Sequence, residues 1–384
     1  MPIETILLAL CLGNTSSGSK QDTTSIPHIR AIWVARRDIT SPEVCHTLVR
    51  IAKEYSFNTL VVQVRGRGDA LYKSSLEPRS ELLKDQPLDF DPLGTILQEA
   101  KKYGIAVHAW INANYTWDSN TPPSSPQHIV NAHPDWLMRD EGNQVVMSRG
   151  EDVEGAYTCP SNELFRQFLK SVYLDVVKNY DVDGVHFDFI RYPSPRFCYC
   201  DRCLQLFKRE MDKRITSERQ QELANDSHRL AYVRAFPREW DRFRREQITR
   251  LVYDVYDGVK ALRPQIIVSA AVFPDYADAF SRRFQDWKKW LADGKLDMIF
   301  PMSYVKSINR LEELISDAIK SSCGKPVVAG IGAWQITPQQ TVEQIKKACE
   351  LGAAGYCLFS YSITNKGENT SYLDVIRDSL GLNQ

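Results

Sequence analysis

The chain has 384 residues, a quarter of them charged, and its 48 Lys and Arg exactly balance its 48 Asp and Glu. With 43% apolar residues, this composition is typical of a globular chain that buries a large core. The neutral balance without a basic block argues against a nucleic-acid-binding protein, and no apolar run is long enough to span a bilayer. Small molecules and glycans are the favoured ligands.

Residues 1–26 are predicted to lie outside the folded domain. Residues 6–12 are apolar, and residues 13–25 are rich in Ser, Gly and Thr, as in a flexible tether. This segment resembles the end of a bacterial lipoprotein signal, with Cys11 as the lipidated residue, although no Lys or Arg precedes it and Leu10 is bulkier than such signals prefer. Two interpretations stay open: export with a lipid anchor at Cys11, which predicts a cell-envelope location, and a cytoplasmic protein with a frayed tail.

Residues 27–384 are predicted to form a single catalytic domain in which strands and helices alternate. Strands are expected at 30–35, 58–64, 104–111, 184–189, 266–272, 296–301, 326–331 and 354–360, and helices at 42–55, 91–103, 162–180, 278–292, 310–321, 338–351 and 371–380. A charged helical region that ends near Arg263 follows the fourth strand. Eight such units predict the α/β class and a closed (β/α)8 TIM barrel rather than an open sheet.

Two connections are long: residues 112–160 after the third strand, and an insertion at about 194–250 after the fourth. Both are expected on the catalytic face of the barrel. Residues 65–69, Arg-Gly-Arg-Gly-Asp, follow the second strand without the glycine spacing of a dinucleotide site. They are interpreted as a substrate loop, and no organic cofactor is predicted.

The fourth strand delivers the most informative residue, Asp188. A buried strand keeps an ionised carboxylate only where it is paired or where it meets solvent or substrate, which favours the mouth of a barrel. Other polar and aromatic residues at strand ends are predicted to bind substrate with it: Gln63, Arg65, His108, Trp110, Asn112, His186, Arg191, Tyr192, Tyr304, Trp334 and Tyr361. Such a mixture suits sugars, whose C–H faces stack on aromatic rings while their hydroxyls form hydrogen bonds.

Several of these residues have a structural alternative. His186 and His108 are equally compatible with core histidines that are hydrogen-bonded to neighbours. Arg191 has the alternative role of pairing with Asp188 and keeping it ionised.

Four segments together resemble the glycosyl-hydrolase-like family 10 proteins, a group of bacterial TIM-barrel lipoproteins. They are residues 30–34, residues 62–65 with 69–72, residues 108–112, and residues 183–193. The resemblance implies a carbohydrate-active enzyme of the cell envelope, because members are linked to cleavage of peptidoglycan glycan strands that lack stem peptides. It does not fix the substrate, which is expected to be an oligo- or polysaccharide of the bacterial envelope or the diet.

Glycoside hydrolysis normally needs two carboxyl groups. Asp188 has the position of an essential carboxylate, and Asp275, just beyond the fifth strand, and Asp69 are the candidates for the second, with Asp38 in reserve. Because the sequence shows no clear second carboxyl group, the alternative is a barrel that binds glycans without cleaving them. Linkage, stereochemical outcome and oligomeric state are not predicted.

A cysteine cluster forms a second constellation. Cys198, Cys200 and Cys203 lie in one short loop, and Cys159 is expected at the same barrel face. Four thiolates predict a closed, structural zinc site, and the arrangement resembles the zinc cluster of family 42 β-galactosidases. Disulfides are the alternative, although cysteines this close in sequence pair poorly with each other.

Overall fold

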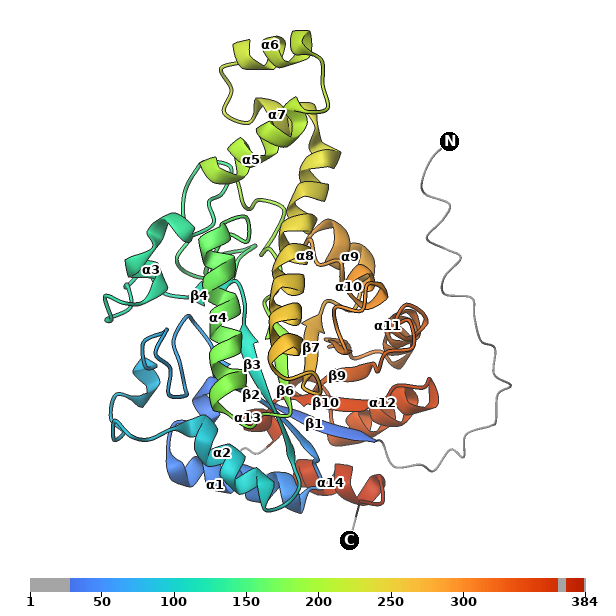
Figure 1. The fold of residues 1–384 in the computed structure, drawn as a ribbon. Helices are drawn as coiled ribbons and strands as arrows, with labels where there is room; N and C mark the ends of the chain where they lie inside the picture. The colour runs from blue at the N-terminus through green and yellow to red at the C-terminus, as the bar shows by residue number, and fades with distance from the viewer. Residues whose placement is uncertain (1–27, 365–370, 383–384) are drawn as a thin grey trace.

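The computed structural model describes residues 28–364 and 371–382, so the predicted lipoprotein segment with Cys11 lies outside the described residues. Eight parallel strands form the central sheet in the order β8-β7-β6-β3-β2-β1-β10-β9. Their bounds are β1 (Ile29–Val34), β2 (Thr59–Arg65), β3 (Ala106–Asn112), β6 (Gly184–Asp188), β7 (Ile267–Val272), β8 (Met298–Pro301), β9 (Val328–Gly332) and β10 (Gly355–Phe359). Bridges from Ile299 to Val327 and from Met302 to Gly330 join the two ends of the sheet. The predicted (β/α)8 barrel is confirmed (Figure 1).

The strands divide their side chains between two cores, because successive residues of a strand point to opposite faces. Trp33, Val61, Trp110, Phe300 and Val328 form a cluster inside the barrel. Alternate residues such as Ile32 and Val62 join the larger outer core beneath the helices.

The surrounding helices begin where the sequence supplies an N-cap. Ser41, Asp91, Asn162, Ser307 and Thr337 each accept a hydrogen bond from a backbone N–H of the first turn, which satisfies a donor that the helix leaves free. The helices they start are α1 (Pro42–Glu54), α2 (Pro92–Lys101), α4 (Glu163–Asn179), α11 (Ile308–Lys320) and α12 (Pro338–Glu350). α8 (Pro237–Leu262) and α14 (Ser371–Ser379) complete the outer layer with the two short helices that follow β7.

The predicted helix 278–292 is wrong in one respect, because it is two helices, α9 (Tyr276–Ser281) and α10 (Trp287–Ala292). Phe284, between them, is fully buried and has φ +54°, a left-handed conformation that ends a helix. The side chain of the next residue, Gln285, accepts a hydrogen bond from the backbone N–H of Phe273 at 2.8 Å. This tertiary contact overrides the local helical pattern.

The two long connections carry structure of their own. After β3 the chain forms β4 (Tyr115–Trp117), α3 (Ile129–Ala132) and β5 (Ala156–Tyr157), and β4 and β5 pair as an antiparallel sheet. After β6 it forms α5 (Asp201–Asp212), α6 (Ser217–Asn225) and α7 (Ala231–Ala235), which project beyond the barrel body (Figure 1).

Short elements complete the description: the 3-10 turns η2 (Arg36–Asp38), η3 (Glu81–Leu83), η4 (Pro134–Trp136) and η5 (Ala333–Gln335), and α13 (Tyr361–Thr364). Within the described ranges, no helix combines the length and the apolar character that crossing a membrane requires.

Candidate active site

A cavity of about 390 Å³ opens at the C-terminal ends of the strands. Strand ends supply Trp33, Gln63, Trp110, Asn112, Asp188 and Phe359 to its lining, the segments just beyond strands supply Arg36, Arg37, Arg191 and Tyr304, and the connection after β3 supplies Tyr115, Asp118, Arg149 and Glu154. This is the face on which TIM-barrel enzymes carry their active sites.

Asp188 is the last residue of β6 and is only 9% exposed. Its Oδ1 accepts a hydrogen bond from the backbone N–H of Phe189 at 2.6 Å. Phe189 has φ +51°, a strained conformation for a residue with a side chain, and it turns the chain out of the strand. Burial raises the pKa of Asp188 to about 6, although the positive charge of Arg191 works in the opposite direction. The site therefore holds a carboxyl group that takes up a proton at a higher pH than an ordinary Asp.

Arg191 pairs with Glu154 rather than with Asp188. Its Nη2 lies 2.9 Å from Glu154 Oε1, and its Nη1 donates to the hydroxyl of Tyr157 at 3.0 Å. That hydroxyl in turn donates to Glu154 Oε2 at 2.6 Å. Burial works to raise the pKa of Glu154, but the charge of Arg191 and these hydrogen bonds outweigh it and lower the pKa below its usual value. Glu154 is thus held ionised.

A third carboxyl group in the cavity, Asp118, is engaged by two arginines. Arg67 Nη1 lies 2.8 Å from Asp118 Oδ1 and Arg36 Nη2 lies 3.3 Å from Oδ2. Burial raises the pKa of Asp118, and the hydrogen bonds from Arg67 and Tyr115 reverse this, so that the net shift is downward. The guanidinium of Arg67 also lies 4.2 Å from the ring centre of Trp117, which fixes its position.

Sequence reasoning missed Glu154 and Asp118. Both belong to the connection after β3, which has no helical or strand periodicity over most of its length. The available signal was Gly155, where a Cβ atom would lie 2.0 Å from the backbone oxygen of Trp117, so that only glycine allows this close crossing of β4 and the chain beside Glu154.

Aromatic and amide side chains form the rest of the lining. Trp110 Nε1 donates to Asn112 Oδ1 at 2.8 Å, and Gln63 Nε2 donates to the same oxygen at 3.3 Å. Tyr304 and Trp334 meet edge to face with ring centres 4.8 Å apart, and Trp334, 46% exposed, lies outside the cavity lining. Of the predicted substrate-binding residues, Gln63, Trp110, Asn112, Arg191 and Tyr304 line the cavity.

The two histidines lie beneath the cavity. His186 is fully buried, with Nδ1 2.9 Å from Ser269 Oγ and Nε2 accepting from Trp33 Nε1 at 3.4 Å. Burial lowers the pKa of His186 well below its usual value and that of His108 to about 4. Neither ring lines the cavity, and the alternative of a hydrogen-bonded core histidine describes His186. His108 is buried as well, but its Nδ1 has no hydrogen-bond partner among the described residues. Tyr192 and Tyr361 are likewise buried and lie outside its lining.

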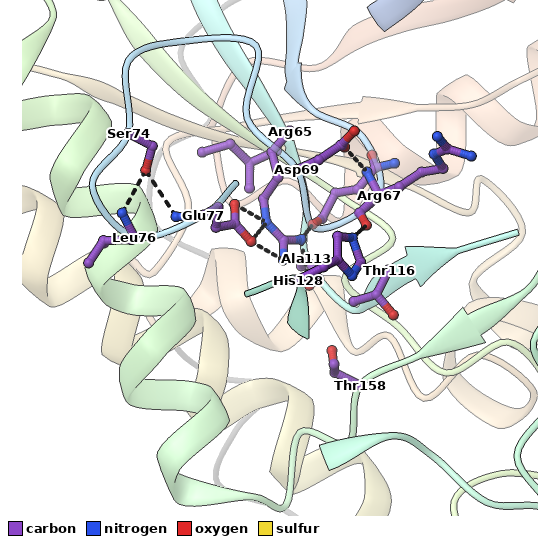
Figure 2. Close-up of polar contacts among 12 residues, drawn as sticks. Arg65, Arg67, Asp69, Ser74, Leu76, Glu77, Ala113, Thr116, His128 and Thr158 are labelled. Carbon is purple, nitrogen blue, oxygen red and sulfur yellow. Dashed lines mark hydrogen bonds and ion pairs between the residues drawn. The ribbon is translucent and has the colours of Figure 1, made fainter. Parts of the chain in front are cut away.

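Arg65 does not line the cavity but contacts the backbone of Asn112, which does. It is fully buried and pairs with Glu77, with Arg65 Nε 2.8 Å from Glu77 Oε2 (Figure 2). Its Nη1 donates to the backbone oxygen of Asn112. This bond ties the end of β2 to the end of β3. Residues 65–69, predicted as a substrate loop, do not contribute to the cavity lining.

The predicted candidates for the second carboxyl group do not lie beside Asp188. Asp69 is buried and accepts from Ser80 Oγ at 2.6 Å (Figure 2 shows it among the contacts of Arg67). Asp275 caps α9, pairs with Arg310 at 2.7 Å and lines a separate surface hollow. The reserve candidate Asp38 is absent from the cavity lining as well.

The four cysteines of the predicted zinc site come together. Their sulfur atoms all lie within 4.8 Å of one another and all four residues are buried free thiols. Cys159 Sγ is 3.3 Å from Cys203 Sγ and 3.9 Å from Cys200 Sγ. A tetrahedral zinc ion with bonds of about 2.3 Å would place its sulfur ligands about 3.8 Å apart, so this donor set fits a metal of that kind.

Comparison with known proteins agrees with this geometry. A family model described as Glycosyl hydrolase-like 10 matches residues 28–344. Glycosyl hydrolase YngK of Bacillus subtilis (strain 168) is 23% identical over 308 residues, which cover 72% of this chain and only 54% of that protein. Glycosyl hydrolase DigH of Escherichia coli (strain K12) is 25% identical over 374 residues, which cover 84% of this chain and 76% of that protein.

Among solved structures, the PgaB (BpsB) glycoside hydrolase domain from Bordetella bronchiseptica matches with a TM-score of 0.68 at 13% identity, covering 94% of this chain and 100% of that one. At this identity the likeness concerns the fold. The two relatives are named as glycosyl hydrolases, and the chain spans about half the length of the first of them. The family model spans most of the barrel. The chain therefore belongs to the Glycosyl hydrolase-like 10 family.

Proposed function

We propose that the protein hydrolyses the glycosidic bonds of a polysaccharide and that Asp188 is an essential carboxyl group of the reaction. The observation that carries the proposal is the position of Asp188, buried at the end of β6 and lining a cavity with aromatic and amide side chains. Trp110 and Tyr304 offer ring faces for the apolar side of a sugar, and Gln63 and Asn112 offer hydrogen bonds to its hydroxyls.

Peptidoglycan glycan strands without stem peptides are the substrate that we propose. The resemblance to the family supports this choice, and so does the charge of the cavity mouth. Arg37 and Arg149 are exposed, line the cavity, and form no ion pair within the described residues. Two free guanidinium groups suit the lactyl carboxylate that each muramic acid unit carries, since arginine recognises carboxylates through paired hydrogen bonds. A cell-envelope location belongs to this proposal, with a cytoplasmic location as its alternative, and cell fractionation tests it.

Incubation of purified protein with peptide-free glycan strands tests the function. The wild type is expected to release new reducing ends, and Asp188→Asn is expected to lower kcat by at least about 100-fold, because an amide cannot exchange the proton that a carboxyl group transfers. A silent glycan-binding barrel would bind the strands and leave them uncut in both forms. An Asp188→Asn variant with full activity would remove Asp188 from the mechanism.

We also propose that the four-cysteine cluster holds a structural zinc ion. Four protein sulfurs close the coordination sphere, so the metal would have no open position for chemistry. The metal would fix the loop after β6 to the connection after β3. Cys159 belongs to the connection after β3, and the other three cysteines belong to the loop after β6. No organic cofactor is required for the proposed hydrolysis.

A further inference from the structure

Glycoside hydrolysis by a pair of carboxyl groups needs a partner for Asp188 in the same cavity. Asp118 and Glu154 are the other two carboxyl groups in its lining. Asp118 has one arginine on each of its oxygens, so its charge is neutralised by two guanidinium groups. Glu154 instead shares its arginine with Asp188, since the charge of Arg191 acts on both carboxyl groups. The two carboxyl groups also affect each other, because the negative charge of Glu154 favours the protonated form of Asp188.

We propose that Glu154 is the second catalytic carboxyl group of this enzyme and that Asp188 is its proton donor. The inference rests on the proposed glycosidase function and assigns the two roles within it. It also places one catalytic group on the barrel and the other on the connection after β3.

The surroundings of the two groups shift their pKa values in opposite directions, upward for Asp188 through burial and downward for Glu154 through Arg191 and its hydrogen bonds. Asp188 is 9% exposed and its pKa is raised to about 6, so that it holds a proton more readily than an ordinary Asp and is half protonated at about pH 6. The Glu154 side chain is 30% exposed and forms an ion pair with Arg191, which keeps it a carboxylate. Paired carboxyl groups whose surroundings push their pKa values apart are the arrangement that acid and base roles require.

The proposed step balances with water as the only co-reactant. The glycosidic C–O bond breaks, and the leaving oxygen takes the proton of Asp188. In a single displacement, a water oxygen bonds to the anomeric carbon and gives its proton to Glu154. In a double displacement, a Glu154 oxygen bonds to the anomeric carbon first, and water then releases the sugar while Asp188 regains its proton. Both routes use the same two carboxyl groups.

The fold holds Glu154 rigidly enough for this role. Tyr157, which donates to Glu154, belongs to β5 and pairs with Tyr115 of β4. Tyr115 stacks on Phe189 with ring centres 4.8 Å apart, and Phe189 directly follows Asp188. The chain that carries Glu154 is therefore packed against the end of the strand that carries Asp188.

Chemical rescue with azide tests the assignment on peptide-free glycan strands. Glu154→Ala is expected to lower the release of reducing ends by about 10²–10⁴-fold. Azide is expected to restore cleavage, because it occupies the space that the carboxylate leaves and attacks the anomeric carbon while Asp188 protonates the leaving oxygen. The product is then a glycosyl azide of inverted configuration, detected by mass spectrometry and NMR, on either route.

Three further samples make the outcome decisive. Glu154→Gln keeps the size of the side chain and should lose activity without a fold change, which circular dichroism checks. Glu151→Gln makes the same chemical change three residues away on an exposed side chain that does not line the cavity, and it should keep wild-type activity. Wild-type protein that leaves the strands intact would overturn the proposed function itself. Active wild type together with an active Glu154→Gln, or with a folded Glu154→Ala that forms no azide adduct, would overturn only the role of Glu154.

Discussion

Asp188 combines two features that cost stability, burial of an ionisable group and a left-handed residue directly after it. Both place the carboxyl group at the cavity floor in a fixed direction. Such a group is expected where function rather than stability determines the residue.

Because burial of the ionised Asp188 carboxylate costs folding free energy, we expect Asp188→Asn to stabilise the protein at high pH. The pKa of Asp188 is raised from 3.8 to about 6, so the folded state binds the proton more tightly than the unfolded state between these values. Wild-type stability therefore falls as the pH rises from about 4 to above 6. The amide removes this loss, and we expect Asp188→Asn to be more stable by up to about 3 kcal/mol at pH 8 and unchanged at pH 4.

Denaturant unfolding followed by tryptophan fluorescence at pH 4, 6 and 8 measures the difference. Asp275→Asn is the matched control, because hydrogen bonding by the N–H of Asp278 and the ion pair with Arg310 lower the pKa of Asp275 and so give the opposite sign. A less stable Asp188→Asn at pH 8 would contradict the prediction.

At this scale the sequence identified the strand-end residues better than the loop residues. Asp188, Trp110 and Asn112 follow from strand patterns, because the end of a parallel strand always opens on the same face. His186 lies on the same strand face as Asp188, yet Ser269 and Trp33 enclose it. How far below the cavity a strand residue lies depends on the register between neighbouring strands, and the sequence of one strand does not show that register.

Among the elements, the β4–β5 pair lies within the connection after β3, and the cysteine cluster joins this connection to the loop after β6. β5 is followed within two residues by Cys159, whose sulfur meets the cysteines of the loop after β6. The loop after β6 also carries Arg191, the partner of Glu154. The cluster therefore lies next to the chain segments that hold the site together.

Zinc analysis tests this connection. Protein purified without chelator is expected to contain about one zinc per chain, and Cys203→Ser is expected to lose it and to unfold roughly 5 °C lower, as for a loss of about 3 kcal/mol. Elemental analysis and thermal unfolding measure the two effects. Cys323→Ser, at an exposed position, is the control and should keep both the metal and the wild-type midpoint. Metal-free wild-type protein would refute the zinc proposal.

The predicted helix 278–292 shows where element prediction fails. Its residues have helical propensity throughout, but the buried Phe284 and the bond from Phe273 to Gln285 fix a turn in its middle. Packing against the barrel decides this boundary, because local propensity is weaker than one buried aromatic side chain.

For the whole molecule, the barrel forms the body and the helices α5 to α7 project beyond it (Figure 1). α6 has a single buried residue, Leu223, and lies at the far end of this insertion (Figure 1). It therefore contributes little to the core that supports the cavity.

Replacement of residues 217–225 by nine Gly and Ser residues tests this division. One lost apolar contact of about 1.5–3 kcal/mol should lower the unfolding midpoint by about 5 °C or less and leave kcat on glycan strands unchanged. Thermal unfolding and reducing-end release measure these outcomes. A loss of activity with intact folding would show that α6 takes part in substrate binding.

The sequence by itself determined the eight strand-helix units, the closed barrel, the place of Asp188 and the spacing of the cysteine cluster. These features depend on short-range periodicity and on strand ends, which a single chain displays directly. Only the tertiary structure decided that Glu154 and Asp118 enter the cavity, while Asp69 and Asp275 lie elsewhere and His186 lies beneath it. Their placement depends on how long connections pack against residues distant in sequence, and that packing energy is not encoded in any local pattern.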